Sequence, residues 1–192
     1  MELAQIQEAL KAHDLELIIG LETHVRLNTK TKLFCACPNT ETEIPNHNIC
    51  SVCTGQMGIL PALNKEAIVK AIYFGKAVQS TFSNEITSWD RKHYEYPDNP
   101  KNIQITQFHN PIIPDGEVSC YRNDGSQFTV YLTQTHIEED AAKLVHEKKI
   151  SLVDFNKAGV PLIEIVTDPC IRNIEDAATY AQYIQRIVQN LG

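Results

Sequence analysis

Apolar and polar residues alternate with helical spacing in three segments of the chain. These segments are residues 1–13, 64–79 and 174–191, and the spacing predicts a helix in each. In the second segment, the apolar side chains available for one packed face are Ala67, Ile68, Ala71, Ile72 and Ala77. We therefore expect three helices, each with one face turned towards other elements of the fold.

Shorter apolar runs, rich in β-branched residues, predict strands between these helices. They are residues 15–25, 127–140, 152–155 and 160–167. Residues 90–114 are rich in aromatic residues and proline, which indicates irregular structure with short strands.

Two dipeptides suggest how these strands are connected. Asp115-Gly116 and Asp124-Gly125 are typical of hairpin turns, and hairpins join antiparallel strands. The pattern therefore predicts the α+β class, with an antiparallel sheet flanked by helices.

Residues 30–61 interrupt this pattern, because they are rich in Cys, Asn, Pro and Thr and show little periodicity. The segment contains two close pairs of cysteines: Cys35, Cys37, Cys50 and Cys53. Two pairs of thiolates can close a tetrahedron around zinc, and zinc binding could supply the folding energy of this loop. We expect a small structural zinc module at residues 30–61. The alternative is four reduced cysteines without metal, since the first pair has C-x-C spacing and not the commoner C-x-x-C.

Composition narrows the functions open to such a fold. The 192 residues are 43% hydrophobic and 21% charged, as in globular proteins, and a net charge of -7 disfavours broad binding to nucleic acid. No apolar run is long enough to span a membrane, and the N-terminus does not resemble a signal peptide, so we expect a cytoplasmic protein without a membrane partner. Cys120 and Cys170 are then expected to be plain thiols.

Acidic and histidine residues interrupt three of the predicted strands. They are Glu22 and His24 in residues 15–25, His136, Glu138 and Asp140 in residues 127–140, and Glu164 in residues 160–167. Residues two apart on a strand face the same side. Buried carboxylates need cations, and basic residues are scarce in these strands. Mg²⁺, which prefers carboxylate oxygens and water, fits the set better than a second zinc ion.

The alternative is that each acid lies on the solvent-exposed face of its own strand. For Glu138, Glu139 and Asp140 taken alone this alternative is favoured, because consecutive acids usually form a solvated cluster. Glu164 is harder to explain in this way, since its apolar neighbours on both sides predict a strand that is buried on both faces.

A basic and aromatic segment, DRKHYEYPD, covers residues 90–98. Arg91 and Lys92 would suit the binding of phosphates, and Tyr94 would suit stacking on a base. By composition alone, a tight surface loop anchored by Tyr94 and Tyr96 is the favoured alternative. The chain has no Walker phosphate loop, Rossmann glycine fingerprint or G-x-S-x-G elbow, so any ATP would have to be held through metal-bridged carboxylates.

Six ordered segments together resemble the B-subunit family of the tRNA-dependent amidotransferases, and the resemblance extends from about Leu15 to the last residue. The segments are GLETHV at 20–25, the two cysteine pairs, GILPALNK at 58–65, DRKHYEYPDNPK at 90–101, HIEEDAAKL at 136–144 and SLVDFNKAGVPLIEIV at 151–166.

The resemblance implies a fold and a reaction. The fold would be a catalytic cradle similar to glutamine synthetase and the guanido kinases, with residues 1–192 as its N-terminal part. The reaction would be a ligation in which the side-chain carboxylate of Glu-tRNA(Gln), Asp-tRNA(Asn) or both is phosphorylated by ATP, and ammonia then displaces phosphate. Ammonia would come from glutamine hydrolysed by an A subunit, with a small C subunit supporting the assembly.

The resemblance also implies roles for individual residues. Positions that match the family's Mg²⁺ site are Glu22, His24, Glu138 and Glu164. Among these, Glu138 and Glu164 would be catalytic together with Lys92, which would lie near the ammonia passage or the acceptor end of the tRNA. Arg91, Lys92 and Tyr94 would contact ATP. The zinc positions are matched by Cys35, Cys37, Cys50 and Cys53.

Some features depart from the family. His93 and Glu95 stand where the family usually has Asn and Phe, which would alter local packing and leave the charged groups in place. The family's cradle continues beyond residue 192 and is followed by helical tRNA-binding domains, so we expect this chain alone not to catalyse transamidation.

Two rival interpretations remain open at the level of sequence. One is a zinc-bearing module that binds RNA or protein without catalysis, and the other is a metal-dependent kinase of small carboxylates. Dependence of ATP cleavage on misacylated tRNA would distinguish the amidotransferase from both.

Overall fold

The computed structural model describes residues 3–83 and 85–192, which contain three helices and eight strands. The helices are α1 (Leu3–Ala12), α2 (Lys65–Ala77) and α3 (Ile174–Leu191). None of the helices in the described ranges is long and apolar enough to cross a membrane. Residues 1–2 of the first predicted helix lie outside the described residues.

A four-stranded antiparallel sheet forms the centre of the molecule. Its strands, in spatial order, are β1 (Glu22–Arg26), β8 (Pro161–Thr167), β5 (Gln127–Glu139) and β4 (Gly116–Tyr121). β8 is therefore flanked on both sides by strands, and it is the most deeply buried strand of the sheet. A side chain on β8 can reach residues of both β1 and β5.

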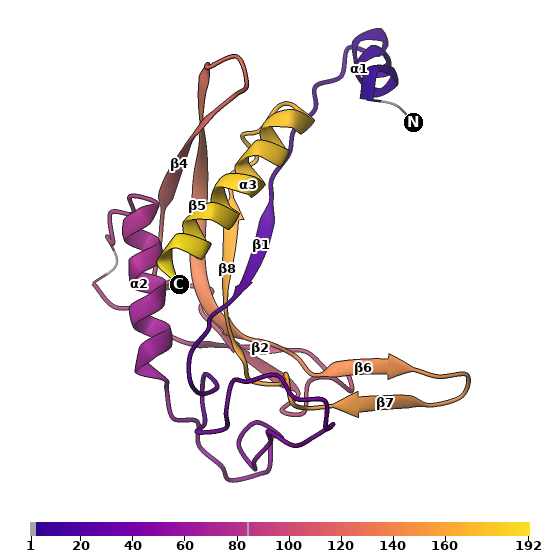
Figure 1. Cartoon of the computed structure of the whole chain (residues 1–192), viewed down its shortest axis with the longest axis vertical. Coiled ribbons are helices and arrows are strands. Elements are labelled where there is room, and N and C mark those ends of the chain that lie inside the picture. The colour runs from indigo at the N-terminus through magenta and orange to yellow at the C-terminus, as the bar shows by residue number, and fades with distance from the viewer. Residues whose placement is uncertain (1–2, 84) are drawn as a thin grey trace.

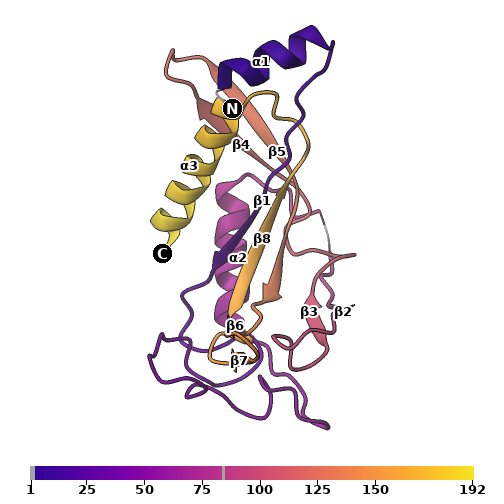
Figure 2. The same ribbon diagram turned by 90° about the vertical axis from the view of Figure 1, so that its right-hand side faces the viewer.

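Two separate hairpins lie at one end of this sheet (Figure 1). One pairs β2 (Asp90–His93) with β3 (Ile103–Thr106), and the other pairs β6 (Lys143–His146) with β7 (Ser151–Asp154). Figure 2 shows the β2–β3 hairpin on the side of the sheet away from α2 and α3. This hairpin carries the basic segment that the sequence singles out.

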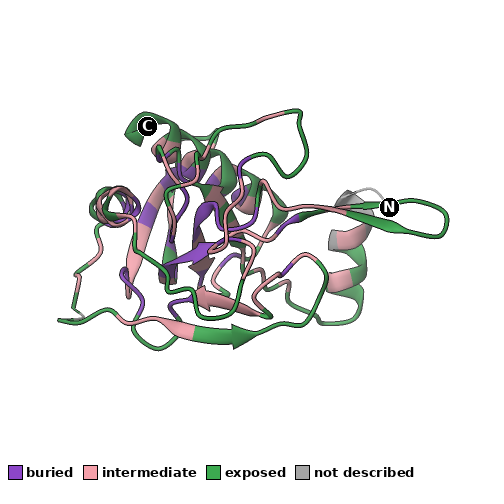
Figure 3. Ribbon diagram, turned by 90° about the horizontal axis from the view of Figure 1, so that it is seen from below, coloured by how far each residue is buried: buried purple, intermediate pink, exposed green. Residues whose placement is uncertain are grey.

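The hydrophobic core lies between the sheet and helices α2 and α3. Ile163 and Ile165 of β8 are fully buried and belong to the same cluster as Phe74 of α2 and Tyr180 of α3. Figure 3 shows the buried residues gathered inside, with exposed residues on the loops and hairpins. Burial of each of these isoleucine and phenylalanine side chains stabilises the fold by about 1.5–3 kcal/mol. Because strand residues alternate, the neighbours of the two isoleucines point to the opposite, more open face.

Local interactions explain where α3 begins. Asn173 caps the helix, since its side chain accepts a hydrogen bond from the backbone of Asp176 at 2.7 Å. The buried Asp176 carboxylate also accepts two hydrogen bonds of 2.7 Å from Arg122, which lies beside the turn between β4 and β5. This pair fixes the start of α3 against the sheet.

Most of the elements predicted from the sequence are confirmed. The antiparallel α+β architecture and the strand segments 127–140, 152–155 and 160–167 are present, and helix 174–191 has the predicted bounds. Gly125 has a φ of 82° in the predicted Asp124-Gly125 turn. Strands β4 and β6 were not predicted individually, because their short runs are half exposed and lack a clear apolar alternation.

Two details of the prediction are wrong. The first strand begins at Glu22 and not at Leu15, because the residues before Glu22 have no strand to pair with beyond an isolated bridge at Ile19. The Asp115-Gly116 dipeptide is no hairpin turn, since Asp115 accepts hydrogen bonds from Ser80 and Thr81 after α2.

The buried face of α2 also differs in part from the prediction. Ala67 and Ala71 are buried and Ile68 and Ile72 are partly buried as expected, whereas Ala77 is exposed. The buried face includes Phe74 and Gly75.

Candidate functional site

Four polar side chains converge on the open face of the sheet. They are His24 of β1, Glu164 of β8, and His136 and Glu138 of β5. In the strand register, Glu164 lies opposite both His24 and His136, so that the three form a row across the sheet. Glu138 lies two residues further along β5 and therefore faces the same side.

The distances between these side chains are short. Nε2 of His24 lies 3.3 Å from Oε1 of Glu138 and 3.2 Å from Oε2 of Glu164. Nε2 of His136 lies 3.5 Å from Oε2 of Glu164 and 3.8 Å from Oε2 of Glu138. The polar atoms of His24, Glu138 and Glu164 all lie within 4.8 Å of one another. We refer to these three residues as the carboxylate triad.

Burial and charge set the electrostatics of this group. Glu138 and His136 are buried, Glu164 is half-buried, and His24 is half exposed. Burial lowers the pKa of His136, but hydrogen bonds to Glu138 and Glu164 outweigh it and raise that pKa to about 9. The hydrogen bond to His136 in turn lowers the pKa of Glu164, against the effect of burial. The lowered pKa of Glu164 favours its ionised form, which attracts positive charge.

The donor atoms of the triad fit a hard divalent cation. Two carboxylates and one imidazole offer oxygen and nitrogen ligands within a small volume. A pocket of about 520 Å³ opens beside Glu138 and Glu164, which leaves room for water or substrate oxygens next to a cation. Glu22 lines this pocket and is not part of the triad.

Two basic residues of β2 also line the pocket. They are Arg91 and Lys92, and the charge of Lys92 contributes to the lowered pKa of Glu164 after the larger effect of His136. Tyr94 does not line this pocket; it borders a smaller cavity of about 60 Å³ beside Lys101 and Glu139. Arg91 and Lys92 thus share a pocket with the triad, whereas Tyr94 does not.

Sequence reasoning did not identify two further residues of this pocket, Asp90 and His109. The Asp90 carboxylate accepts hydrogen bonds from the backbone of Phe108 at 2.8 Å and of His109 at 3.0 Å, and lies 2.9 Å from Nδ1 of His109. These hydrogen bonds, first that of the His109 backbone, lower the pKa of Asp90 to about 2. The pair fixes the loop after β3 at the pocket mouth, a long-range contact that no local pattern signals. His136 belongs to the acid and histidine set predicted from the sequence, but no specific role was predicted for it; the structure places its Nε2 beside Glu138 and Glu164.

The acidic cluster of β5 is not solvated, which corrects the interpretation favoured for it in isolation. Glu138 and Glu139 are both 4% exposed. Glu139 points to the opposite face from Glu138, pairs with Lys101 and accepts a hydrogen bond from the backbone of Ile105 at 3.2 Å. Asp140 pairs with Lys157 at 2.8 Å. β5 is packed on both faces as far as Glu139, so Glu138 and Glu139 meet different partners on opposite faces. Asp140 follows the strand and has its own partner in Lys157.

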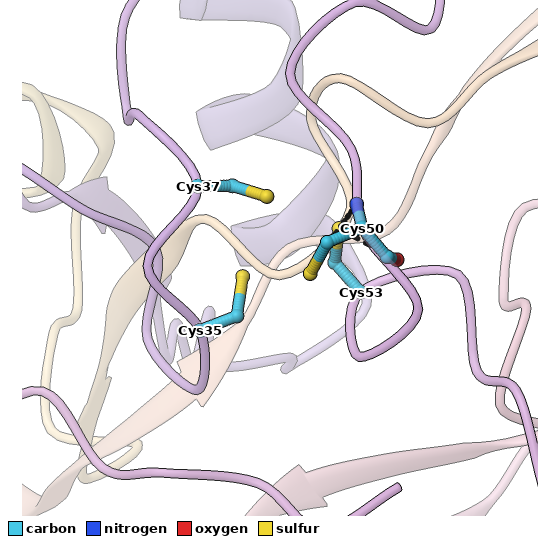
Figure 4. Close-up of side chains that lie close together, drawn as sticks. All are labelled: Cys35, Cys37, Cys50 and Cys53. Carbon is cyan, nitrogen blue, oxygen red and sulfur yellow. Dashed lines mark hydrogen bonds between the residues drawn. The ribbon is translucent and has the colours of Figure 1, made fainter.

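The four cysteines of residues 30–61 form a second cluster. Figure 4 shows the thiols of Cys35 and Cys37, from one loop, facing those of Cys50 and Cys53, from the next. All four sulfur atoms lie within 4.8 Å of one another, and none is in a disulfide. No helix or strand lies between residues 30 and 61. The sulfur cluster is therefore where the two loops meet.

The geometry of this cluster fits tetrahedral zinc. Sulfur atoms about 2.3 Å from a tetrahedral zinc ion lie about 3.8 Å apart, and Sγ of Cys50 and Cys53 are 3.9 Å apart. A hydrogen bond with Cys35 lowers the pKa of Cys53 to about 4, and the pKa of Cys35 is raised by the same contact. The four sulfur atoms match the ligand set of a closed tetrahedral zinc site.

The sequence is similar to known proteins over most of its length. The sequence matches the family model described as GatB/GatE catalytic domain over residues 17–192. It is 48% identical over 177 residues to the B subunit of the aspartyl/glutamyl-tRNA(Asn/Gln) amidotransferase of Helicobacter pylori strain HPAG1. It is 48% identical over 176 residues to the protein of the same name in Protochlamydia amoebophila, and 46% identical over 176 residues to that of Campylobacter jejuni subsp. doylei.

These similarities cover most of the chain and a minor part of each relative. The matched region is 92% of this chain in each case, and 37%, 35% and 37% of the three relatives in turn. The chain thus spans little more than a third of the length of the curated relatives that it matches.

Proposed function

Because the chain belongs to the family of GatB/GatE catalytic domains, we propose that it provides the carboxylate-activating site of a tRNA-dependent amidotransferase. Its substrates would be ATP and Glu-tRNA(Gln), Asp-tRNA(Asn) or both, and its products Gln-tRNA(Gln) or Asn-tRNA(Asn). The observation that carries the proposal is the carboxylate triad of His24, Glu138 and Glu164, which shares a pocket with basic residues of β2.

The reaction we propose has two steps. In the first, an oxygen of the aminoacyl side-chain carboxylate attacks the γ-phosphorus of ATP, and the bond from that phosphorus to ADP breaks. In the second, ammonia attacks the acyl carbon of the acyl phosphate, a carbon–nitrogen bond forms, and phosphate leaves with the attacking carboxylate oxygen. The attacking carboxylate is already ionised, so the first step needs positioning and charge stabilisation more than a general base.

Residues of the chain would perform that positioning. Lys92 and Arg91 line the same pocket as the acids, where their charges would hold phosphate oxygens. Lys92 would also lie near the entering ammonia or the acceptor end of the tRNA. His136 donates towards Glu138 and Glu164 and so would hold the two carboxylates in place. Contact of Tyr94 with ATP remains part of the proposal, although Tyr94 borders a neighbouring cavity.

Mg²⁺ is the cofactor we propose for the triad. Glu138, Glu164 and His24 would hold it, with Glu22 on the same pocket wall as a further ligand or a ligand of bound water. When bound, Mg²⁺ would neutralise charge on the phosphates of ATP. The exposed side of His24 and the open pocket beside Glu164 leave the substrate access to that position.

Zinc is proposed for the four-cysteine cluster, with a structural role. The supporting observation is that four sulfur atoms meet within 4.8 Å in a segment without helix or strand. We propose residues 30–61 as a zinc module inserted in a catalytic cradle of the glutamine synthetase and guanido kinase type.

The relatives are named as B subunits, and we propose that this chain likewise acts with an A subunit that hydrolyses glutamine and a C subunit. Release of phosphate from ATP tests the function, measured with these residues joined to the C-terminal region of a matched relative and assembled with both partners. We expect release with Glu-tRNA(Gln) and only background release with deacylated tRNA. Release that ignores the aminoacyl group would contradict the proposal and favour a kinase, and no release under any condition would favour a non-catalytic binding module.

A further inference from the structure

Lys32 is a fully buried lysine in the loop that leads to the first cysteine pair. Its side chain is 0% exposed. Its backbone N–H donates to the carbonyl of Cys37 at 3.0 Å, which ties it to the cysteine loop. Its Nζ donates a hydrogen bond to the carbonyl of Phe155 at 3.3 Å. A carbonyl carries only a partial charge, so this contact leaves most of the positive charge of an ammonium group unbalanced.

Neighbouring lysines show how unusual this arrangement is. Lys101 pairs with the carboxylate of Glu139, and Lys157 pairs with that of Asp140. Within the described ranges, Lys32 has no carboxylate at ion-pair distance. Moving an ammonium group from water into the protein interior without an opposite charge has a free-energy cost on the order of several kcal/mol. Its burial therefore requires an anion nearby.

Cys53 of the cysteine cluster and Lys32 both lie next to Gly159. At Gly159, where a Cβ atom would lie, the surroundings include Cβ of Cys53 at 3.5 Å, Cδ of Lys32 at 3.7 Å and Oε2 of Glu139 at 3.8 Å. Glu139 already holds Lys101, so Cys53 is the remaining group near Gly159 that can carry a negative charge next to Lys32.

The charge of a zinc-bound cluster matches this arrangement. Zinc with four thiolates is left with two uncompensated negative charges. Cys53, the thiolate beside Lys32, is only 3% exposed, so water screens it poorly. We propose that Lys32 is the built-in counter-cation of the four-cysteine cluster, so that zinc binding and burial of the Lys32 ammonium group stabilise each other. The inference rests on the zinc site of the proposed function and adds a residue outside its ligand set.

The alternative explanation is that Lys32 serves only to fill space. Its alkyl chain packs in the interior, and a residue of the same length without charge would then do equally well. Lys32→Met separates the two explanations because methionine keeps most of the volume and loses the charge. Lys30→Met is the matched control, since Lys30 lies two residues away on the same loop and is exposed.

The experiment measures zinc affinity of the 192-residue chain by competition with a chromophoric chelator, with folding checked by circular dichroism at saturating zinc. Outer-sphere partners of metal ligands typically contribute 10- to 100-fold to metal affinity. We expect about a 10- to 100-fold loss for Lys32→Met and no more than about a twofold change for Lys30→Met. Equal zinc affinity of Lys32→Met and the unmodified chain would overturn the inference.

Two further results keep the test decisive. If Lys32→Met does not fold with zinc present, Lys32→Gln and Lys32→Arg are compared. Zinc retained by the arginine variant and lost by the glutamine variant would support the inference. Equal retention of zinc by both variants would overturn it. Failure of the unmodified chain to bind zinc would refute the zinc site itself. That outcome is distinct, because it is read from the unmodified chain and involves no substitution of Lys32.

Discussion

Nε2 of His24 lies 3.3 Å from Oε1 of Glu138, although the two residues are on strands that do not pair with each other. β8 lies between those strands and supplies Glu164, which approaches the same histidine nitrogen at 3.2 Å. Three segments far apart in the sequence thus place their polar atoms around one point. Such convergence is hard to explain by stability alone, because it crowds carboxylates together.

Replacement of Glu164 by glutamine tests the metal role of the triad. Glu164→Gln keeps the size of the side chain and removes one anionic ligand, so we expect loss of Mn²⁺ binding, used as a probe for Mg²⁺, and at least about a 100-fold fall in ATP cleavage by the assembled enzyme. Electron paramagnetic resonance of free Mn²⁺ and a phosphate assay measure the two effects. Glu117→Gln, on β4 of the same sheet, is the control. Near-normal turnover of Glu164→Gln would show that Glu164 is not required for ATP cleavage.

The ion pairs of His136 predict a specific dependence of stability on pH. Its pKa is raised from 6.5 to about 9 in the folded chain, so the protonated form is favoured by folding. This stabilisation, of the order of 1–3 kcal/mol, is fully present below pH about 6.5 and is lost as the pH rises to about 9. Urea unfolding of the metal-free chain at several pH values should show this decline, and His136→Gln should flatten it. An equal decline in both proteins would assign the effect to other groups.

The buried pair of Glu139 and Lys101 holds the β2–β3 hairpin against β5. Glu139 accepts from Ile105, and its carbonyl accepts from Gln104 at 2.9 Å, so three contacts join this residue to the hairpin and its loop. Glu139→Gln or Lys101→Met alone leaves a buried charge unpaired, and each should lower the free energy of unfolding by about 3–5 kcal/mol.

The double variant provides the check on this interpretation. With both charges removed, the loss should be clearly smaller than the sum of the two single losses. Lys149→Met, on an exposed loop, is the control and should be neutral. Additive losses in denaturant unfolding would show that Glu139 and Lys101 act independently.

Removal of one cysteine should empty the zinc module. We expect close to one zinc per chain in the unmodified protein and almost none in Cys50→Ser, because the hydroxyl of serine is a poor zinc ligand. Cys170→Ser is the control, since Cys170 lies outside the cluster. Elemental analysis after gel filtration measures the ratio. Equal zinc content of Cys50→Ser and the unmodified chain would show that zinc binds at another site.

The elements with strong internal patterns were predictable from the sequence. Helix 174–191 combines a cap with a clear apolar stripe, and the apolar run around Glu164 correctly indicated a central strand. The cysteine spacing likewise indicated a four-thiol cluster, which the structure brings together. In each case the information lies within one short segment.

The features that were not predictable depend on contacts between distant segments. Glu139 looks solvated in the sequence, and only the position of Lys101, thirty-eight residues away, shows that it is buried and paired. The strand expected from Leu15 has suitable residues and lacks a partner strand before Glu22. The buried Lys32 has no local signal either, because its environment is built by Phe155 and Gly159.

The most direct test of the central claim follows the oxygen that links the two proposed steps. The assembled enzyme is given Glu-tRNA(Gln) whose side-chain carboxylate carries isotopically labelled oxygen, together with ATP and glutamine, and the released phosphate is examined by mass spectrometry. Attack of the carboxylate on ATP predicts that one labelled oxygen passes to phosphate for each amide formed. Amide formation with unlabelled phosphate would show that the carboxylate is not phosphorylated, and would contradict this account of the site.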